Sequence, residues 1–317
     1  MGESLRCTSL HGVAEIVSSP FSGSSFWLHT AAAILFVIGL MLTIRNETSQ
    51  VRGLDRLISF GRMFLAVPLA IFGMQHFVFL NDVANGVPSW MPGHLFWACF
   101  VGTALIAACL SLITGVQAEL AALLLGSMFF LFVLLIYLPN VLRNPQDRFA
   151  VALFFRDLAL SGGAFALAGT LAAKSRPRDA RWLVVLGRFF FAVPMTFFGL
   201  EHFLHPDFAP GVPLAQMMPP WMPGHLIWAY VTGTALIACG VSILLERGGR
   251  WAATGLGVTF VVLVVFIYTP MEILHPSIAI SGELDYVADT LAMSGAALLV
   301  AGAFGGSEVV ARHHAEP

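Results

Sequence analysis

The chain has 317 residues, of which 58% are hydrophobic and 11% are charged, and its formal net charge is −2. Soluble domains carry about half apolar and about a quarter charged residues, so this composition excludes a soluble protein and predicts the lipid bilayer as partner. No run of Lys or Arg indicates binding to nucleic acid. The four cysteines include no Cys-x-x-Cys pair, which argues against a thiol redox site and a disulfide framework.

A membrane-spanning helix needs about 20 predominantly apolar residues, and nine stretches of the sequence are close to this length. Pro139 and Pro270 are expected to end two of the helices, because proline cannot donate a helical hydrogen bond. The sequence therefore predicts an all-α polytopic integral membrane protein, in which the first stretch either spans the bilayer or lies against the bundle. The expected helices are 26–44, 57–80, 94–114, 118–138, 149–172, 182–204, 225–245, 251–269 and 286–304.

Basic residues outside these helices fall mainly on one side of the predicted topology. By the positive-inside rule this side is cytoplasmic, so the C-terminus is expected inside and the N-terminus outside. Three arginines, Arg6, Arg143 and Arg148, fall on the opposite side. The basic side holds Arg45, Arg52, Arg56, Lys174, Arg176, Arg178, Arg181, Arg247, Arg250 and Arg312.

Two parts of the sequence repeat each other. The stretch Trp-Met-Pro-Gly-His occurs at 90–94 and at 221–225. The pattern Gly-Arg-x-Phe-x-Ala-Val-Pro occurs at 61–68 and at 187–194. Each repeat contains four expected helices, so the two copies share one orientation and are expected to be related by a pseudo-two-fold axis along the membrane normal.

This duplication predicts the domain organisation. The first four-helix bundle is expected at 57–172 and the second, in tandem and parallel to it, at 182–304. Residues 1–56 are expected to hold an outer tail, the extra N-terminal transmembrane helix and a basic link. Residues 305–317 form a predicted cytoplasmic tail.

Ionisable residues gather at the predicted outer ends of the helices. Such residues are costly at bilayer depth, so they usually face a bundle interior and pair with one another. Imidazoles beside carboxylates can relay protons, bind a metal or form hydrogen bonds with the oxygens of a quinone. A structural role at the headgroup region is the alternative, and we assign no metal site. The candidates are His76, His94, Arg156, Asp157, Glu201, His202, His205, His225, Glu272, His275 and Asp289.

Two further candidates, Arg62 and Arg188, lie near the predicted inner ends of matching helices. Each can bind an anionic head group, balance a buried carboxylate, or extend its charged end to the membrane surface. The second repeat differs from the first because Glu201 replaces Gln75 and because its outer loop, 204–220, is longer. If only one repeat is active, these differences favour the second.

The motifs resemble those of the DoxX-like family of bacterial membrane proteins. The resemblance rests on Gly-Arg-x-Phe-x-Ala, on Phe-Gly-x-x-His-Phe, on Val-Pro-x-Trp-Met-Pro at 87–92, and on Trp-x-x-x-x-Gly-x-x-x-Ile at 97–106 and 228–237. It implies a helical bundle in the inner membrane of a bacterium. Some relatives are linked to sulfur or thiosulfate oxidation with quinone as acceptor, or to membrane-bound redox and detoxification assemblies. The resemblance therefore implies a link of this kind. The chain departs from the usual single unit by its two repeats and its extra first helix.

From these observations we expect an accessory or membrane-anchoring component of a quinone-linked redox system, with membrane redox proteins as partners, rather than an independent enzyme. The cofactor implied by the resemblance is a quinone. A transporter for a small solute or a proton is the alternative, since parallel repeats and buried ionisable groups also occur there. The apolar middle of most helices weakens this second interpretation. A structural membrane scaffold without activity of its own is the third.

Overall fold

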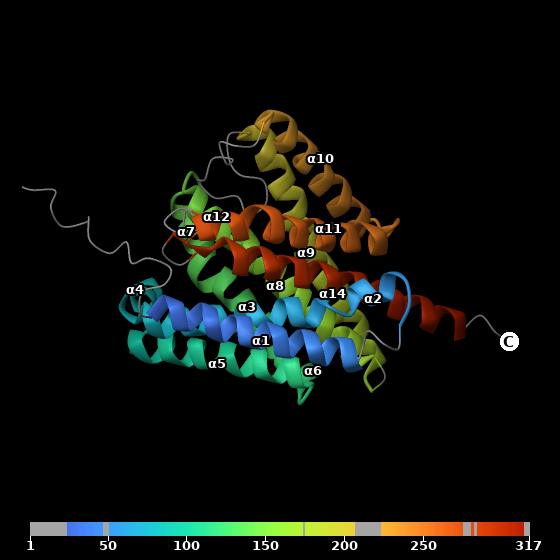
Figure 1. The fold of residues 1–317 in the computed structure, drawn as a ribbon, viewed down its shortest axis with the longest axis horizontal. Coiled ribbons are helices and arrows are strands. Elements are labelled where there is room, and N and C mark those ends of the chain that lie inside the picture. The colour runs from blue at the N-terminus through green and yellow to red at the C-terminus, as the bar shows by residue number, and fades with distance from the viewer. Residues whose placement is uncertain are drawn as a thin grey trace, which may run out of the picture.

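The computed structural model describes residues 24–46, 51–173, 175–206, 223–274, 280–281 and 284–313. These residues form an almost entirely helical bundle (Figure 1). The predicted all-α membrane fold is confirmed by its helices. The elements are α1 Ser24–Asn46, α2 Leu54–Ile58, α3 Gly61–Val78, α4 Leu80–Gly86, α5 His94–Thr114, α6 Ala118–Phe132, η2 Val133–Tyr137, α7 Leu138–Arg143, α8 Arg148–Ala172, α9 Pro177–Leu204, α10 His225–Leu244, α11 Gly249–Leu263, η3 Val264–Tyr268, α12 Thr269–Leu274, β1 Ile280–Ser281, β2 Leu284–Asp285 and α14 Tyr286–His313.

Eight helical segments of the described chain are long and apolar enough to cross a membrane. They correspond to the last eight of the nine stretches that the sequence predicts. The first of the nine stretches, 26–44, corresponds to α1. This helix has 23 residues and would be about 34 Å long at 1.5 Å per residue. It runs along α3 (Figure 1). Gly39 of α1 faces the side chain of Met63 of α3. That α1 spans the bilayer stays a prediction.

Two helices continue through the prolines that were expected to end them. The segments η2 and η3 have π-helical hydrogen bonding, and each is followed within two residues by Pro139 or Pro270. A proline inside a helix lacks an N–H and displaces the carbonyl four residues before it, and a local π turn accommodates both effects. The expectation that these prolines end the helices is therefore wrong, and α7 and α12 extend the two spans beyond the expected ends.

The centre of the bundle is the contact between α8 and α14. In their most apolar stretches, 78% of the α8 residues and 89% of the α14 residues are buried, more than in the other spanning helices described. Small residues allow this close approach, since a Cβ added to Gly163 would lie 2.5 Å from the Cβ of Ala296. The two helices therefore form a tightly packed axis around which the others lie.

Helices α3 and α9 each pack on the central helix of the other predicted unit, an exchanged packing. Helix α3 packs on α14, and α9 packs on α8. Both contacts require glycine: Gly295 lies directly against the backbone of Leu65, and a Cβ on Gly162 would lie 2.6 Å from the carbonyl oxygen of Gly187. The first helix of each predicted unit thus packs on the last helix of the other, and residues of both units share one continuous apolar core.

A small element precedes α14. Strands β1 and β2 pair antiparallel, with Ile280 opposite Asp285 and Ser281 opposite Leu284. The side chain of Asp285 accepts a hydrogen bond of 2.9 Å from the backbone N–H of Ala288, so it caps the first turn of α14. This strand pair was not expected from the sequence. The cap fixes the start of α14, close to Asp289.

Candidate functional site

The end of the bundle that carries His76 and His202 is called the outer end here, and the end that carries Arg62 and Arg188 the inner end. A buried charged cluster lies toward the outer end, between α8 and α14. Arg156 Nε donates to Asp157 Oδ1 at 2.9 Å, and Arg156 Nη1 donates to Asp289 Oδ1 at 3.1 Å. The Arg156 side chain is 14% exposed, and both aspartates are 1% exposed.

The charges of this Arg156–Asp157–Asp289 cluster do not balance. One guanidinium faces two carboxylates, so the cluster carries one net negative charge when all three groups are ionised. Asp289 Oδ2 and Thr290 Oγ1 are buried, and within the described chain they have no hydrogen-bond partner. A buried polar atom without a partner costs about 1–3 kcal/mol, which indicates a place for a water, a proton or a ligand atom.

Two tyrosines interact with the cluster, and a third stacks on one of them. Tyr137 at the end of η2 interacts electrostatically with Arg156, and Tyr286 does so with Asp289. The Tyr286 ring stacks on the Tyr268 ring, with centroids 5.5 Å apart and planes 19° apart. These tyrosines were not among the candidates expected from the sequence. A signal was present, because the chain has only four tyrosines and two of them occupy matching places before Pro139 and Pro270.

A second polar feature is the pair of histidines near the ends of α3 and α9. His76 Nδ1 lies 2.7 Å from the carbonyl oxygen of Phe72, and His202 Nδ1 lies 2.7 Å from that of Phe198. A carbonyl oxygen only accepts, so Nδ1 donates its proton, and in a neutral imidazole Nε2 then carries a lone pair. His202 Nε2 is buried and has no hydrogen-bond partner among the residues that the structure describes.

Glycines on the neighbouring helices make room for both histidines. A Cβ on Gly102 would lie 2.8 Å from the Cβ of His76, and a Cβ on Gly233 would lie 2.9 Å from the Cβ of His202. Any larger residue would push the imidazole away. The glycine of the Trp-x-x-x-x-Gly pattern therefore positions the histidine of the Phe-Gly-x-x-His-Phe pattern.

Phenylalanines link the histidine of α9 to the cluster on α8. The rings of Phe155 and Phe197 stack with centroids 3.8 Å apart, and Phe198 meets Phe155 edge-on at 6.2 Å. Phe155 directly precedes Arg156, and Phe198 accepts the hydrogen bond from His202. This aromatic group therefore includes the neighbour of Arg156 in the sequence and the residue whose carbonyl binds His202.

The remaining outer candidates do not join this arrangement. Glu201 forms an ion pair of 3.1 Å with Arg148, which connects the end of α9 to the start of α8. His94 is half-buried at the start of α5, and His205 is exposed after α9. The side chains of His225 and Glu272, together with His275 and the greater part of the outer loop, lie outside the described residues. Within the described chain, no group of three His, Cys, Asp or Glu residues could hold a metal ion.

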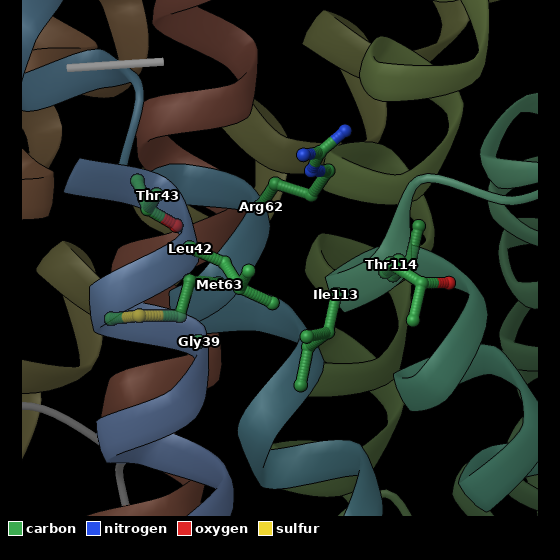
Figure 2. A pocket seen from close by; sticks show the side chains of 8 residues that line it. Gly39, Leu42, Thr43, Arg62, Met63, Ile113 and Thr114 are labelled. Atoms are coloured by element: carbon green, nitrogen blue, oxygen red, sulfur yellow. The ribbon is translucent and has the colours of Figure 1, made fainter. Parts of the chain in front are cut away.

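The two inner arginines have different surroundings. Arg188 is buried, pairs with Glu246 at 2.8 Å, and places its Cζ 4.0 Å from the centre of the Phe304 ring. Arg62 is half-buried and lines a small crevice between α1, α3 and α5 (Figure 2). Glu246 was not among the candidates from sequence, because it lies in a turn and is largely exposed.

These features define a multi-pass helical membrane protein with a buried ionic cluster near one end. The family model for DoxX matches residues 183–269, which extend from α9 to the first residue of α12. The DoxX-like resemblance is thus confirmed over these residues, which are similar to a DoxX domain. Neither the curated proteins nor the solved structures that were compared include a match to the chain.

Proposed function

We propose that the chain is a membrane component of a quinone-linked redox system that holds a quinol head group at its outer end. The observation that carries the proposal is the buried Nε2 of His202, which has no hydrogen-bond partner in the described chain. Because Nδ1 donates to Phe198, the neutral imidazole presents a proton acceptor. A quinol hydroxyl is a matching donor, whereas the carbonyl oxygen of an oxidised quinone is not.

Two further features support a quinol rather than another ligand. The rings of Phe155, Phe197 and Phe198 form an aromatic group on α8 and α9, near His202 in the sequence of α9, and aromatic rings pack favourably on a flat conjugated head group. Oxidation of a quinol releases two protons and two electrons. His202 Nε2 and the unpartnered Asp289 Oδ2 are two buried atoms that can accept such protons. The electrons pass to a partner protein of the membrane, so the chain acts as an accessory or anchoring component.

Transport of a proton or a small solute is the second candidate, and the uncompensated charge of the Arg156–Asp157–Asp289 cluster favours it. A transport path needs polar groups along its length. Below the cluster, however, α8 and α14 are closed by the contact of Gly163 with Ala296 and by buried residues such as Ala159 and Ala292. In the described helices, this close apolar packing leaves no polar path from the cluster to the inner end, which supports a site that a ligand enters from the outer end only.

The test is deletion of the gene, followed by assay of quinol-dependent oxidoreductase activity in isolated membranes. The proposal expects a loss that the wild-type gene restores and the His202→Phe variant does not. Phe keeps the bulk beside Gly233 but removes the proton acceptor. If activity is unchanged on deletion while liposomes with the purified protein show proton or solute flux, transport is the function. If neither signal is present, the chain is a scaffold.

A further inference from the structure

Helix α1 covers one side of the first unit. A Cβ built on Gly39 of α1 would lie 2.9 Å from Met63 Cγ and 4.0 Å from Ile113 Cδ1, and Figure 2 shows these three residues together. The ring of Phe36 on α1 stacks on that of Phe64 on α3, with centroids 6.5 Å apart. An added helix therefore packs on α3, beside Ile113 of α5.

The second unit has the matching helices but, within the described chain, no counterpart of α1. Helix α9 meets α10 as α3 meets α5: a Cβ on Gly73 would lie 2.8 Å from the carbonyl oxygen of Gly102, and one on Gly199 would lie 2.7 Å from that of Gly233. The residues of the two helix pairs can therefore be compared position by position. The described helices that pack closely on α9 are α8, α10 and the central helix α14.

The side chains of α9 show that the side matching the one under α1 is open. Met63 is 2% exposed, whereas Phe189, which takes its place in the repeated pattern, is 53% exposed. One turn further along the same face, Val67 is buried and its counterpart Val193 is half-buried. Residues that are covered in the first unit are thus uncovered in the second.

Helix α10 adds to this open side. Leu244 is exposed, and its counterpart on α5 is the half-buried Ile113 that faces Gly39. We call the surface formed by Phe189, Val193 and Leu244 the α9–α10 face. It matches the part of the first unit on which α1 lies.

Positions away from α1 do not differ in this way. Leu65 and Phe191 match each other and are both fully buried. Phe100 and Val231 match on the surfaces of α5 and α10, and they are 52% and 54% exposed. Looser packing of the whole second unit would raise the exposure of Phe191 and Val231 as well. The difference at the α9–α10 face therefore follows from the presence of α1 on the first unit.

We propose that the α9–α10 face binds a single membrane-spanning helix of a partner protein. Apolar side chains in a membrane can also face lipid, so exposure alone does not indicate a partner. The observation that indicates a helix is that the same chain covers the matching face with α1. The fitting helix has about 20 apolar residues and a glycine or alanine opposite Phe189, as Gly39 lies opposite Met63. This binding does not depend on the quinol site at His202.

The test is photo-crosslinking of the full-length chain in its native membrane. The photoreactive residue p-benzoylphenylalanine replaces Phe189 in one variant and Val231 in the other, and both positions are exposed, so both variants are expected to fold. Irradiation should join the Phe189 variant to another protein. Digestion and mass spectrometry should place the joined peptide within an apolar helix of that protein. The Val231 variant should be joined to lipid only.

A bulky substitution on α10 provides the matched variant. Leu244→Trp is expected to fold, because Leu244 is exposed, but its indole occupies the place of the partner's backbone. The yield of the Phe189 crosslink should therefore fall about tenfold or more. A crosslink between two copies of this chain would overturn the proposal in favour of a dimer. Lipid adducts alone at Phe189, the same crosslink from Val231, or an unchanged yield in Leu244→Trp would also overturn it.

Discussion

Arg156 on α8 donates to Asp289 on α14 at 3.1 Å, and each lies five residues before a buried serine, Ser161 or Ser294. These serines donate to the carbonyl oxygens of Gly126 and Gly257, both at 2.8 Å. The arginine and the aspartate therefore occupy matching places on the two central helices and meet across their contact. The charged cluster is thus part of the axis of the bundle.

Removal of Arg156 is expected to be more damaging than removal of one carboxylate. Arg156→Leu leaves Asp157 and Asp289 buried without their cation, and breaking a buried ion pair in this way costs about 3–5 kcal/mol. Asp289→Asn costs less, since Arg156 keeps Asp157 and the excess negative charge disappears. Unfolding of the purified proteins in detergent measures the order. A larger loss for Asp289→Asn would contradict this description of the cluster.

The contact of α8 with α9 is expected to tolerate no methyl group at Gly162. A Cβ there would lie 2.6 Å from backbone atoms of both Gly187 and Phe191, so Gly162→Ala should lower stability by about 1–3 kcal/mol. Gly255→Ala on α11 is the control, because no atom lies within 4 Å of its added Cβ. There the better helix propensity of alanine should raise stability by up to about 1 kcal/mol. Melting temperatures of both variants check the contrast, and equal effects would argue against the exchanged packing.

Substitution of Arg188 is expected to lower stability more than substitution of its ion-pair partner Glu246. Glu246 is 61% exposed, so Glu246→Gln is expected to change stability by less than about 1 kcal/mol. Arg188→Ala also removes a buried side chain that covers the Phe304 ring, and it should cost more. Thermal unfolding in low and high salt tests this. Only the Glu246 variant should lose its small effect as salt increases, and two equal losses would show that packing on Phe304 contributes little.

The membrane orientation is predicted from the distribution of basic residues and can be measured. In a background without cysteines, Asn144→Cys and Arg247→Cys place single thiols in exposed turns at opposite ends of the bundle. A reagent that does not cross membranes should label Asn144→Cys in intact cells and Arg247→Cys only after permeabilisation. The reverse pattern would invert the predicted topology.

Much of the fold could be predicted from the sequence because apolar length is a local property. The stretch 94–114 coincides with α5, and most other predicted boundaries differ by up to about five residues, whereas α14 continues nine residues beyond the expected end at 304. α9 begins at Pro177 rather than at 182, since a proline in the first turn of a helix is favourable even in a basic segment. The exchanged packing of α3 and α9 could not be predicted, because it depends on contacts between residues far apart in the chain.

The candidate site was predicted only in part. Arg156, Asp157 and Asp289 were all selected as costly charges at membrane depth, yet their mutual contact required the structure. Tyr137 and Tyr268 were missed because a tyrosine in an apolar helix also fits the membrane interface. His94 and His205 were selected for their residue type, and the structure places them outside the arrangement of His202 and the cluster.

The most direct test of the proposed function is the amount of quinone that copurifies with the chain after gentle extraction from its native membrane. Mass spectrometry of the extracted lipids should find close to one quinone or quinol for each chain. The amount should fall strongly in His202→Phe and stay unchanged in His205→Ala, whose imidazole is exposed at the same end. Protein without bound quinone, or His202→Phe with the wild-type amount, would contradict the assignment of His202 to a quinol site.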